Sequence, residues 1–186
     1  ARALGLLPRL HVDQLNSSGG AEFAALSGAV SADHLEFASD EGLKALAASG
    51  TVAVILPLAS ICTSQPPLDA RRLLRAGVKV AVATDFNPGS APSYHLPLAM
   101  FLSCALCRLR PGEALKAATI HAAQALKIEA LTGSLESGKR ADFALIDAPD
   151  ANQWLYNFQA NACLLTVSGG KVTFRSPGSC GKSTHT

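Results

Sequence analysis

The sequence predicts an α/β protein that contains half of an eight-stranded barrel, or a small open parallel sheet, followed by a short β segment. Two observations predict this class. Short apolar segments alternate with single helix-like segments at about 22 to 27 residues per unit, which is typical of βα units on a parallel sheet. After about residue 130 the pattern changes to short β-like segments joined by glycine turns.

Composition and charge narrow the classes of partner. The 186 residues are 48% hydrophobic, which is enough to bury a sizeable core. The net charge is +2 and charges of both signs are interspersed, so we expect no nucleic-acid partner and instead a small neutral or anionic substrate. No apolar run approaches the roughly 20 residues that span a bilayer, so we expect no membrane partner.

The start of the chain and its cysteines bear on where the protein works. No basic and apolar signal segment opens the sequence, and the five cysteines are irregularly spaced, so we expect a cytoplasmic protein with reduced thiols. The sequence begins with Ala1 rather than Met and reaches a strand-like segment almost at once. We therefore expect a fragment of a longer protein.

Four apolar segments are predicted to be strands, and helix-like segments separate them. The first helix starts near Gly19, and the second opens with Ser39 or Asp40 as its N-cap. The third, at 66–77, closes at its final glycine. The predicted strands are residues 8–12, 29–35, 51–59 and 78–85.

The rest of the chain begins with helices and ends with β structure. Two segments have apolar residues at helical spacing and a proline near the start, and two later segments resemble strands. The last of these folds back at a Gly169-Gly170 hairpin turn, and the small polar tail from Ser176 is expected to be disordered. The predicted helices are residues 94–109 and 111–128, and the β segments are 133–147 and 162–174.

Polar side chains stand at or near the downstream ends of three predicted strands: His11, His34 and Asp85. The carboxyl ends of parallel strands form the ligand-binding face of such sheets. Two imidazoles and a carboxylate around that face are donors that zinc and similar divalent ions prefer. Asp85 also ends a run of small apolar residues, where an unpaired carboxylate is costly to bury and so needs a partner.

Structural roles are the alternative for each of these residues. A histidine at a strand end often forms structural hydrogen bonds. An aspartate before a turn often caps a helix or closes an Asx turn, and the sequence Asp-Phe-Asn-Pro-Gly from Asp85 suits a turn in its own right. The joint placement of the three on consecutive units of one sheet favours a site.

Other residues with reactive or ligating side chains are weaker candidates. Cys104 and Cys107 have zinc-like spacing but no second pair, and they fall in an apolar helix, so buried thiols are the better interpretation. His121 and His185 are expected to be structural or solvated. His95 follows the fourth strand closely enough to line a pocket.

Several segments together carry a family resemblance: HVDQLNSSGGAEFAALSG, SADHLE, LLRAGVKVAVATDFNPGS and GSLESGKRADFALID. They resemble the imidazolonepropionase family of the amidohydrolase superfamily, and the resemblance covers residues 6 to about 175. SADHLE together with ATDFNPGS is far more specific than either alone, whereas GSLESGKRADF is shared across amidohydrolases.

The resemblance implies a fold and its boundaries. Residues 1–130 would form the C-terminal half of a TIM (β/α)8 barrel, with strands five to eight and their helices. Residues 131–175 would return into part of a small β-sandwich, and residues 176–186 would be a disordered tail.

The resemblance also implies residue roles. His11 resembles the metal-ligating histidine of barrel strand five, and Asp85 the strand-eight aspartate that ligates the metal and takes a proton from the attacking water. His34 resembles the strand-six histidine beside that water and the substrate carbonyl, where it would offer a donor to the developing oxyanion. The implied substrate-binding residues are Gln14, Asn87, Gly89 and Ser90.

The implied reaction is metal-dependent hydrolysis of the ring of 4-imidazolone-5-propanoate to N-formimidoyl-L-glutamate, a step of histidine degradation. The implied cofactor is one zinc or iron ion. The full-length protein is implied to be a cytoplasmic homodimer.

The sequence departs from the family in what it lacks. It has no His-x-His pair of the kind found at barrel strand one, and no counterpart of strands two to four. His11 and Asp85 supply two protein ligands, one fewer than the three that are usual in catalytic zinc sites. Two alternatives therefore stay open: a catalytically inactive truncated amidohydrolase or half-barrel subunit, and another cyclic amidohydrolase or amidine deaminase.

Overall fold

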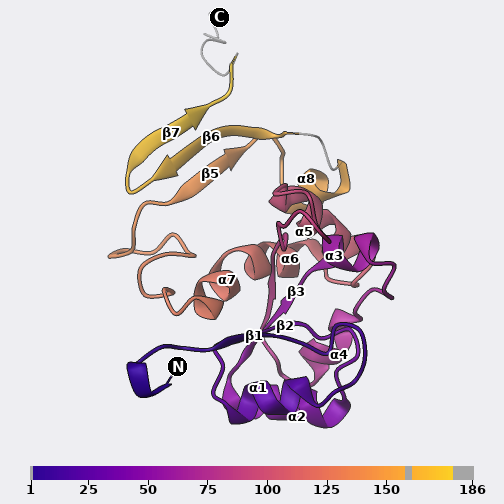
Figure 1. Ribbon diagram of the computed structural model, residues 1–186. Helices are drawn as coiled ribbons and strands as arrows, with labels where there is room; N and C mark the ends of the chain where they lie inside the picture. The colour runs from indigo at the N-terminus through magenta and orange to yellow at the C-terminus, as the bar shows by residue number, and fades with distance from the viewer. Residues whose placement is uncertain (1, 158–160, 178–186) are drawn as a thin grey trace, which may run out of the picture.

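A computed structural model of the protein describes residues 2–157 and 161–177. Its main sheet has four parallel strands in the order β1-β2-β3-β4, so strands that follow one another along the chain lie side by side (Figure 1). The predicted alternation of strands and helices on a parallel sheet is confirmed. The strands are β1 (Arg9–Val12), β2 (Ser31–His34), β3 (Val52–Ile55) and β4 (Val80–Val82).

Helices connect these strands and follow them. Ser39 is the N-cap of the second long connection, since its hydroxyl accepts a hydrogen bond from the backbone N–H of Gly42. Among the described helices, each is too short or too polar to cross a bilayer. The helices are η1 (Arg2–Leu4), α1 (Gly20–Leu26), α2 (Asp40–Ser49), α3 (Pro57–Cys62), α4 (Ala70–Arg75), α5 (Leu96–Ala105), α6 (Pro111–Ala118), α7 (Ile120–Ala125) and α8 (Ala151–Asn157).

Some elements differ from those predicted. The third strand ends at Ile55 rather than at Ala59, because Pro57 starts α3 and proline suits the first turn of a helix. The helix predicted over 111–128 is divided into α6 and α7, because Thr119 leaves the helical region at φ −123° and ψ −96°. Helix α8 was not predicted from the sequence.

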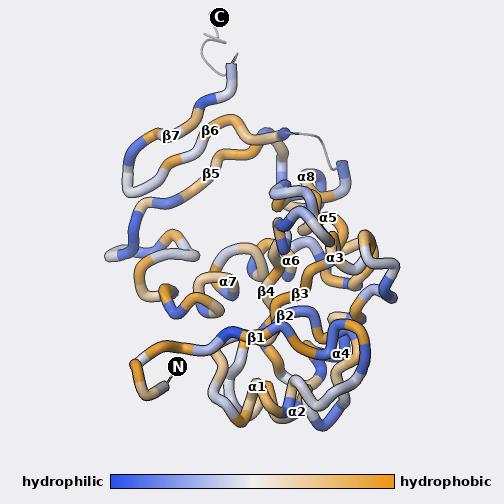
Figure 2. Tube along the Cα trace, in the orientation of Figure 1, coloured by the Kyte–Doolittle hydropathy of each residue, from blue (hydrophilic) through white to orange (hydrophobic). Residues whose placement is uncertain are grey.

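The main apolar core lies on one face of the parallel sheet. Ala53, Ile55 and Val80 belong to this core, together with residues of α1, α2, α4, α5 and α6. Their neighbours Val52 and Ala81 belong to a smaller cluster that includes α7. Because successive strand residues point to opposite faces, α7 packs against the other face of the sheet. Figure 2 shows the hydrophobic strands β3 and β4 at the centre of this arrangement.

The second face of the sheet is more polar and partly open. Arg9 pairs in register with Ser31, and His11 pairs with Asp33. Because side chains alternate between the two faces of a strand, these four side chains lie on the face opposite the main core. A cavity of about 230 Å³ lies on this face, lined by Arg9, Ser31, Asp33, Val54 and residues of α7. The cavity therefore lies on the same face of the sheet as the side chain of His11.

A separate antiparallel sheet holds the last strands, in the order β5-β6-β7, above the parallel sheet in Figure 1. The predicted hairpin is confirmed, since Gly169 and Gly170 join β6 to β7 with positive φ angles of 55° and 78°. Of the tail predicted to be disordered, residues 178–186 lie outside the described part of the chain. The strands are β5 (Phe143–Ile146), β6 (Cys163–Ser168) and β7 (Lys171–Arg175).

The close contact between α1 and α2 gives a test of the packing. A Cβ added to the buried Gly42 would lie 2.7 Å from the Cβ of Ala21, so Gly42→Ala is expected to lower the free energy of unfolding by about 1–3 kcal/mol. Urea denaturation measures the change. The control is Gly112→Ala in α6, where a Cβ meets open space and stability should stay the same or rise by up to about 1 kcal/mol. Equal losses in both variants would contradict this packing.

Candidate metal centre

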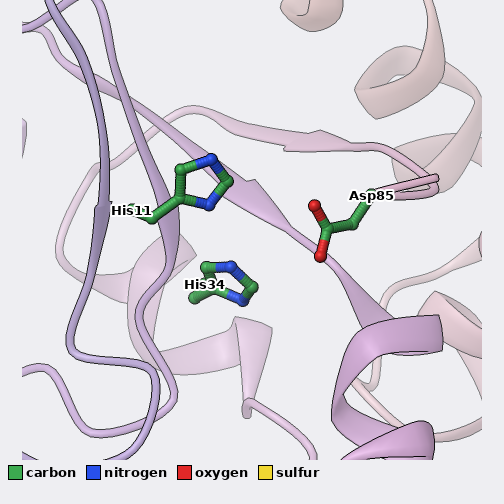
Figure 3. A group of neighbouring side chains, drawn as sticks. All are labelled: His11, His34 and Asp85. Atoms are coloured by element: carbon green, nitrogen blue, oxygen red, sulfur yellow. The ribbon is translucent and has the colours of Figure 1, made fainter. Parts of the chain in front are cut away.

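His11, His34 and Asp85 meet at the carboxyl-end edge of the parallel sheet. Each offers one ligand atom, and these atoms all lie within 4.8 Å of one another. The ring centroids of His11 and His34 are 5.1 Å apart, with the rings tilted by 45°. The carboxylate of Asp85 points towards both rings (Figure 3). The fold thus brings together the three residues that the sequence singles out.

The strand register explains why these residues meet. His11 lies opposite Asp33 in the ladder between β1 and β2, and His34 ends β2 one residue later. Asp85 follows the end of β4, after Ala83 has continued the pairing by donating its N–H to the carbonyl of Ile55. All the side chains of the cluster therefore come from the same end of the strands of one parallel sheet.

Each strand that supplies the cluster ends in a left-handed backbone turn at a residue other than glycine. The φ angles are 50° at Asp13, 78° at His34, 70° at Leu35 and 54° at Asp85. Such residues are uncommon because their Cβ crowds the backbone, at a cost on the order of 1–3 kcal/mol each. Strain of this kind concentrates at functional sites, where the fold holds a side chain in a required direction.

The three side chains differ in exposure. The His11 side chain is 63% exposed, the His34 side chain is 3% exposed, and Asp85 is half-buried. Burial lowers the pKa of His34, and the charge of His11 adds to this effect, while the carboxylate of Asp85 acts in the opposite direction. His34 is accordingly a neutral imidazole near pH 7, with one nitrogen lone pair and one N–H.

The turn after β1 is held by the buried carboxylate of Asp13. It accepts hydrogen bonds from the backbone N–H groups of Ser18, Gly20 and Ala21, at 2.9, 3.1 and 2.8 Å, and from the hydroxyl of Ser18 at 3.0 Å. Burial alone would raise the pKa of Asp13, but these hydrogen bonds outweigh it and hold the pKa below its usual value. Asp13 thereby fixes the loop that follows His11.

This carboxylate makes stability depend on pH. Asp13→Asn is expected to cost about 1–3 kcal/mol at pH 7, because its amide group would present a donor to one of the backbone N–H groups. A lowered folded-state pKa means that the carboxylate stabilises the fold above its unfolded value of 3.8 and loses this effect as the pH falls through the folded value. Urea denaturation should therefore show the gap between the two proteins narrowing below pH 3.8. A gap of constant size would contradict the role of Asp13.

The loop after Asp85 is organised by the side chain of Asn87. Its Oδ1 accepts from the backbone N–H groups of Gly89 and Ser90, both at 2.8 Å. Its Nδ2 donates to the Asp85 carbonyl at 2.6 Å and to the Ser90 hydroxyl at 3.1 Å. The exposed rings of Phe86 and Tyr94 meet edge to face, with centroids 5.7 Å apart. In this conformation the polar groups of the Asn87 side chain are engaged within the loop itself.

The substrate-binding residues implied by the family resemblance lie on the two loops that flank the cluster. Gln14 is half-buried in the turn after β1, next to Asp13. Gly89 is exposed and Ser90 is half-buried in the loop after β4. Their roles in substrate binding stay predictions.

The weaker candidates have structural roles. His95 caps α5, where its Nδ1 accepts the N–H of Leu98 at 3.1 Å. His121 donates from Nδ1 to the Val80 carbonyl at 2.9 Å and so joins α7 to the edge of β4. Burial raises the pKa of the Cys107 thiol to about 12, which makes it an inert core group. His185 lies outside the described residues.

Two acidic residues beside the cluster were missed by the sequence reasoning. Asp33 lies 3.8 Å from Nε2 of His11, and burial raises the pKa of its carboxyl group. Glu36 lies 4.0 Å from Nδ1 of His34, and its pKa is also raised by burial. The available signal was their position in Ser-Ala-Asp-His-Leu-Glu, within two residues of His34.

The donor set fits a metal ion. Two imidazole nitrogens and a carboxylate oxygen lie within 4.8 Å of one another, and this mixture of N and O donors suits zinc or iron. His11 and Asp85 would hold the ion, with His34 beside it. Such an ion would also give the half-buried Asp85 carboxylate the partner that its position requires.

Comparison with known proteins identifies the family. Residues 11–173 match the Amidohydrolase family, and this range makes up most of the chain. The chain belongs to the amidohydrolase family. This agrees with a His-His-Asp cluster at the carboxyl ends of parallel strands.

Curated relatives carry a more specific name. The chain is 47% identical over 171 residues to the imidazolonepropionase of Geobacillus thermodenitrificans, an alignment that covers 92% of this chain and 40% of the relative. It is 45% identical over 175 residues to the imidazolonepropionase of Shewanella sp. strain ANA-3, covering 92% of this chain and 42% of the relative. The chain therefore spans about two fifths of the length of the curated relatives it matches.

Solved structures share the fold at lower identity. An adenosine deaminase from Xanthomonas campestris with bound zinc superposes with a TM-score of 0.75 and 20% identity, over 92% of this chain and 46% of that one. A prolidase complexed with N-methylphosphonate-L-proline superposes with a TM-score of 0.76 and 16% identity, over 95% of this chain and 47% of that one. These neighbours support the fold and leave the substrate to other arguments.

Proposed function

We propose that this chain is the C-terminal half of an imidazolonepropionase, which hydrolyses 4-imidazolone-5-propanoate to N-formimidoyl-L-glutamate in histidine degradation. The observation that carries the proposal is the convergence of His11, His34 and Asp85 in a chain 47% identical to a protein of that name. The full-length protein would be a cytoplasmic homodimer, as the family resemblance implies.

The proposed architecture is the second half of a TIM barrel, with β1 to β4 as barrel strands five to eight. Residues 1–130 would form this half, and residues 131–175 would belong to the small β-sandwich. Two features support it. Both β1 and β4 are edge strands of the described parallel sheet, and edges of this kind are normally paired or covered. Leu4, Leu6 and Leu7 near the start of the chain are more than half exposed, as expected of a surface that further chain covers.

The metal-binding residues in this proposal are His11 and Asp85, with further ligands from residues outside this sequence. When bound, zinc or iron would lower the pKa of the attacking water from about 15.7 towards neutrality and polarise the ring carbonyl. The rest of the chemistry falls to side chains. The half-buried Asp85 carboxylate accepts a proton from the water as the water oxygen bonds to the carbonyl carbon.

His34 acts on the other side of the reacting group. Its buried imidazole donates an N–H to the oxyanion that develops on the carbonyl oxygen, in a setting where burial strengthens the hydrogen bond. The ring C–N bond then breaks, and the proton held by Asp85 passes to the released nitrogen. The products are the formimidoyl group and a new carboxylic acid in one molecule, and the acid then ionises by releasing the second proton of the water to solvent.

The loops beside the cluster are proposed to hold the substrate. Gln14 would contact the ring, and the loop of Asn87, Gly89 and Ser90 would bind the propanoate carboxylate. The N–H groups of Gly89 and Ser90 now donate to Asn87 Oδ1, so the substrate carboxylate would compete with that oxygen for them. Asn87 would keep the loop in shape for this exchange.

Asp85 gives the sharpest test of the proposed mechanism. In the full-length protein, Asp85→Asn is expected to lower kcat on the order of 10²–10⁴-fold and to change KM far less, because the amide cannot take the proton from water. Formation of N-formimidoyl-L-glutamate measures the rate. The control is Asp69→Asn, since Asp69 caps α4 and should leave kcat unchanged. An unchanged turnover in Asp85→Asn would remove Asp85 from this role.

The two alternatives, an amidine deaminase and an inactive protein, predict different results in an activity assay. An amidine deaminase would release ammonia from cyclic substrates, whereas the proposed enzyme opens the ring and retains both nitrogens. Assays of ring opening and ammonia release on a panel of azole substrates therefore separate them. An inactive protein would do neither, and would bind no stoichiometric metal. Ring opening of 4-imidazolone-5-propanoate without ammonia is the expected result for the full-length protein.

A further inference from the structure

Glu36 is a buried carboxyl group beside His34, and no step of the proposed reaction involves it directly. Its side chain is 2% exposed, and its Oε2 lies 4.0 Å from Nδ1 of His34. Among the described residues, neither atom has a hydrogen-bond partner. A buried polar atom without a partner costs on the order of 1–3 kcal/mol, so two such atoms that face each other need an explanation.

The fold holds Glu36 in this position from two sides. The hydroxyl of Ser60, which is buried in α3, donates to Oε1 of Glu36 at 2.7 Å. The left-handed residues His34 and Leu35 turn the chain sharply, and the Leu35 side chain is completely buried in the core. This turn directs Glu36 back towards the imidazole of His34 instead of into solvent.

We propose that Glu36 is a positioning residue that closes a hydrogen bond with Nδ1 of His34 and so directs the Nε2–H of His34 at the substrate carbonyl. The inference rests on the proposed function, because it provides the donor that the oxyanion requires. Ser60, Glu36 and His34 then form one chain of hydrogen bonds that runs from α3 to the site.

The direction of this bond follows from the surroundings of both groups. The side chains of His34 and Glu36 are only 3% and 2% exposed. An uncompensated charge is costly at this depth, which favours a hydrogen bond between two neutral groups. The carboxyl group therefore donates its O–H and Nδ1 accepts. A neutral imidazole that accepts at Nδ1 carries its proton on Nε2. The present 4.0 Å is too long for a hydrogen bond, and contacts of this kind tighten in the substrate complex.

The tautomer of His34 is the direct test. Long-range proton–nitrogen NMR spectra of the full-length protein, labelled at histidine and loaded with diamagnetic zinc, report which ring nitrogen is protonated. The His34 signals are assigned by their loss in His34→Gln. We expect a single Nε2–H tautomer in the wild type and in Glu36→Gln, and a mixture in Glu36→Leu. An Nδ1–H tautomer in the wild type, or the same spectrum in Glu36→Leu, would overturn the proposal.

Kinetics provide the second measurement. Glu36→Leu is expected to lower kcat about 10–100-fold with KM changed by less than about twofold, and Glu36→Gln to restore most of the loss. The matched control is Glu22→Leu. The Glu22 carboxylate also accepts from a serine, Ser39, and has a buried, unpaired Oε2, but it lies at the contact between α1 and α2.

The control separates positioning from folding. Glu22→Leu should lower stability and leave kcat unchanged, so equal loss of kcat in both variants would assign Glu36 a purely structural role. If the wild-type protein does not open the ring, the proposed function fails. The tautomer measurement still decides the role of Glu36 in that case, because it requires no turnover.

Discussion

The parallel register of four short strands is the constraint on which the rest of this structure depends. Each strand pairs with the next one along the chain, so all four end at the same edge of the sheet. That edge collects His11 from β1, His34 from β2 and Asp85 after β4. The end of β3 contributes less directly, through α3 and its Ser60. A shift of one residue in any of these ladders would point a site residue to the wrong face.

The buried polar side chains at this edge of the sheet differ in whether their polar atoms have hydrogen-bond partners. Asp13 is buried, and the hydrogen bonds that it accepts explain its place in the fold completely. His34 and Glu36 are equally buried, yet each keeps an unpaired polar atom. Buried polar atoms without a partner are uncommon in native proteins, and here two of them lie 4.0 Å apart beside the metal centre. The carboxylate of Asp85 points towards two imidazoles, and this sets Asp85 apart from an ordinary turn residue.

Much of this arrangement could be predicted from the sequence, because it depends on periodicity. Apolar strands at regular spacing fix which residues stand at strand ends, and this was enough to group His11, His34 and Asp85. The role of Glu36 could not be found in this way, since it depends on two consecutive left-handed residues that a periodic pattern does not reveal.

Local conformation also accounts for the other differences between sequence and structure. The break at Thr119 divides an apolar pattern that reads as one continuous helix. His95 and His121 are recognised as structural only from the backbone groups that they bond, which belong to Leu98 and Val80. For both histidines the deciding contact joins two groups whose proximity the sequence does not show.

The central claim is that His11 and Asp85 hold a metal ion beside His34. Anomalous diffraction from crystals of the full-length protein, recorded on both sides of the zinc and iron absorption edges, would locate and identify that ion. The account predicts one peak at about 2.0–2.2 Å from a ring nitrogen of His11 and from a carboxylate oxygen of Asp85. A metal peak away from these two residues, or an ion that keeps its place in His11→Ala and Asp85→Ala, would contradict it.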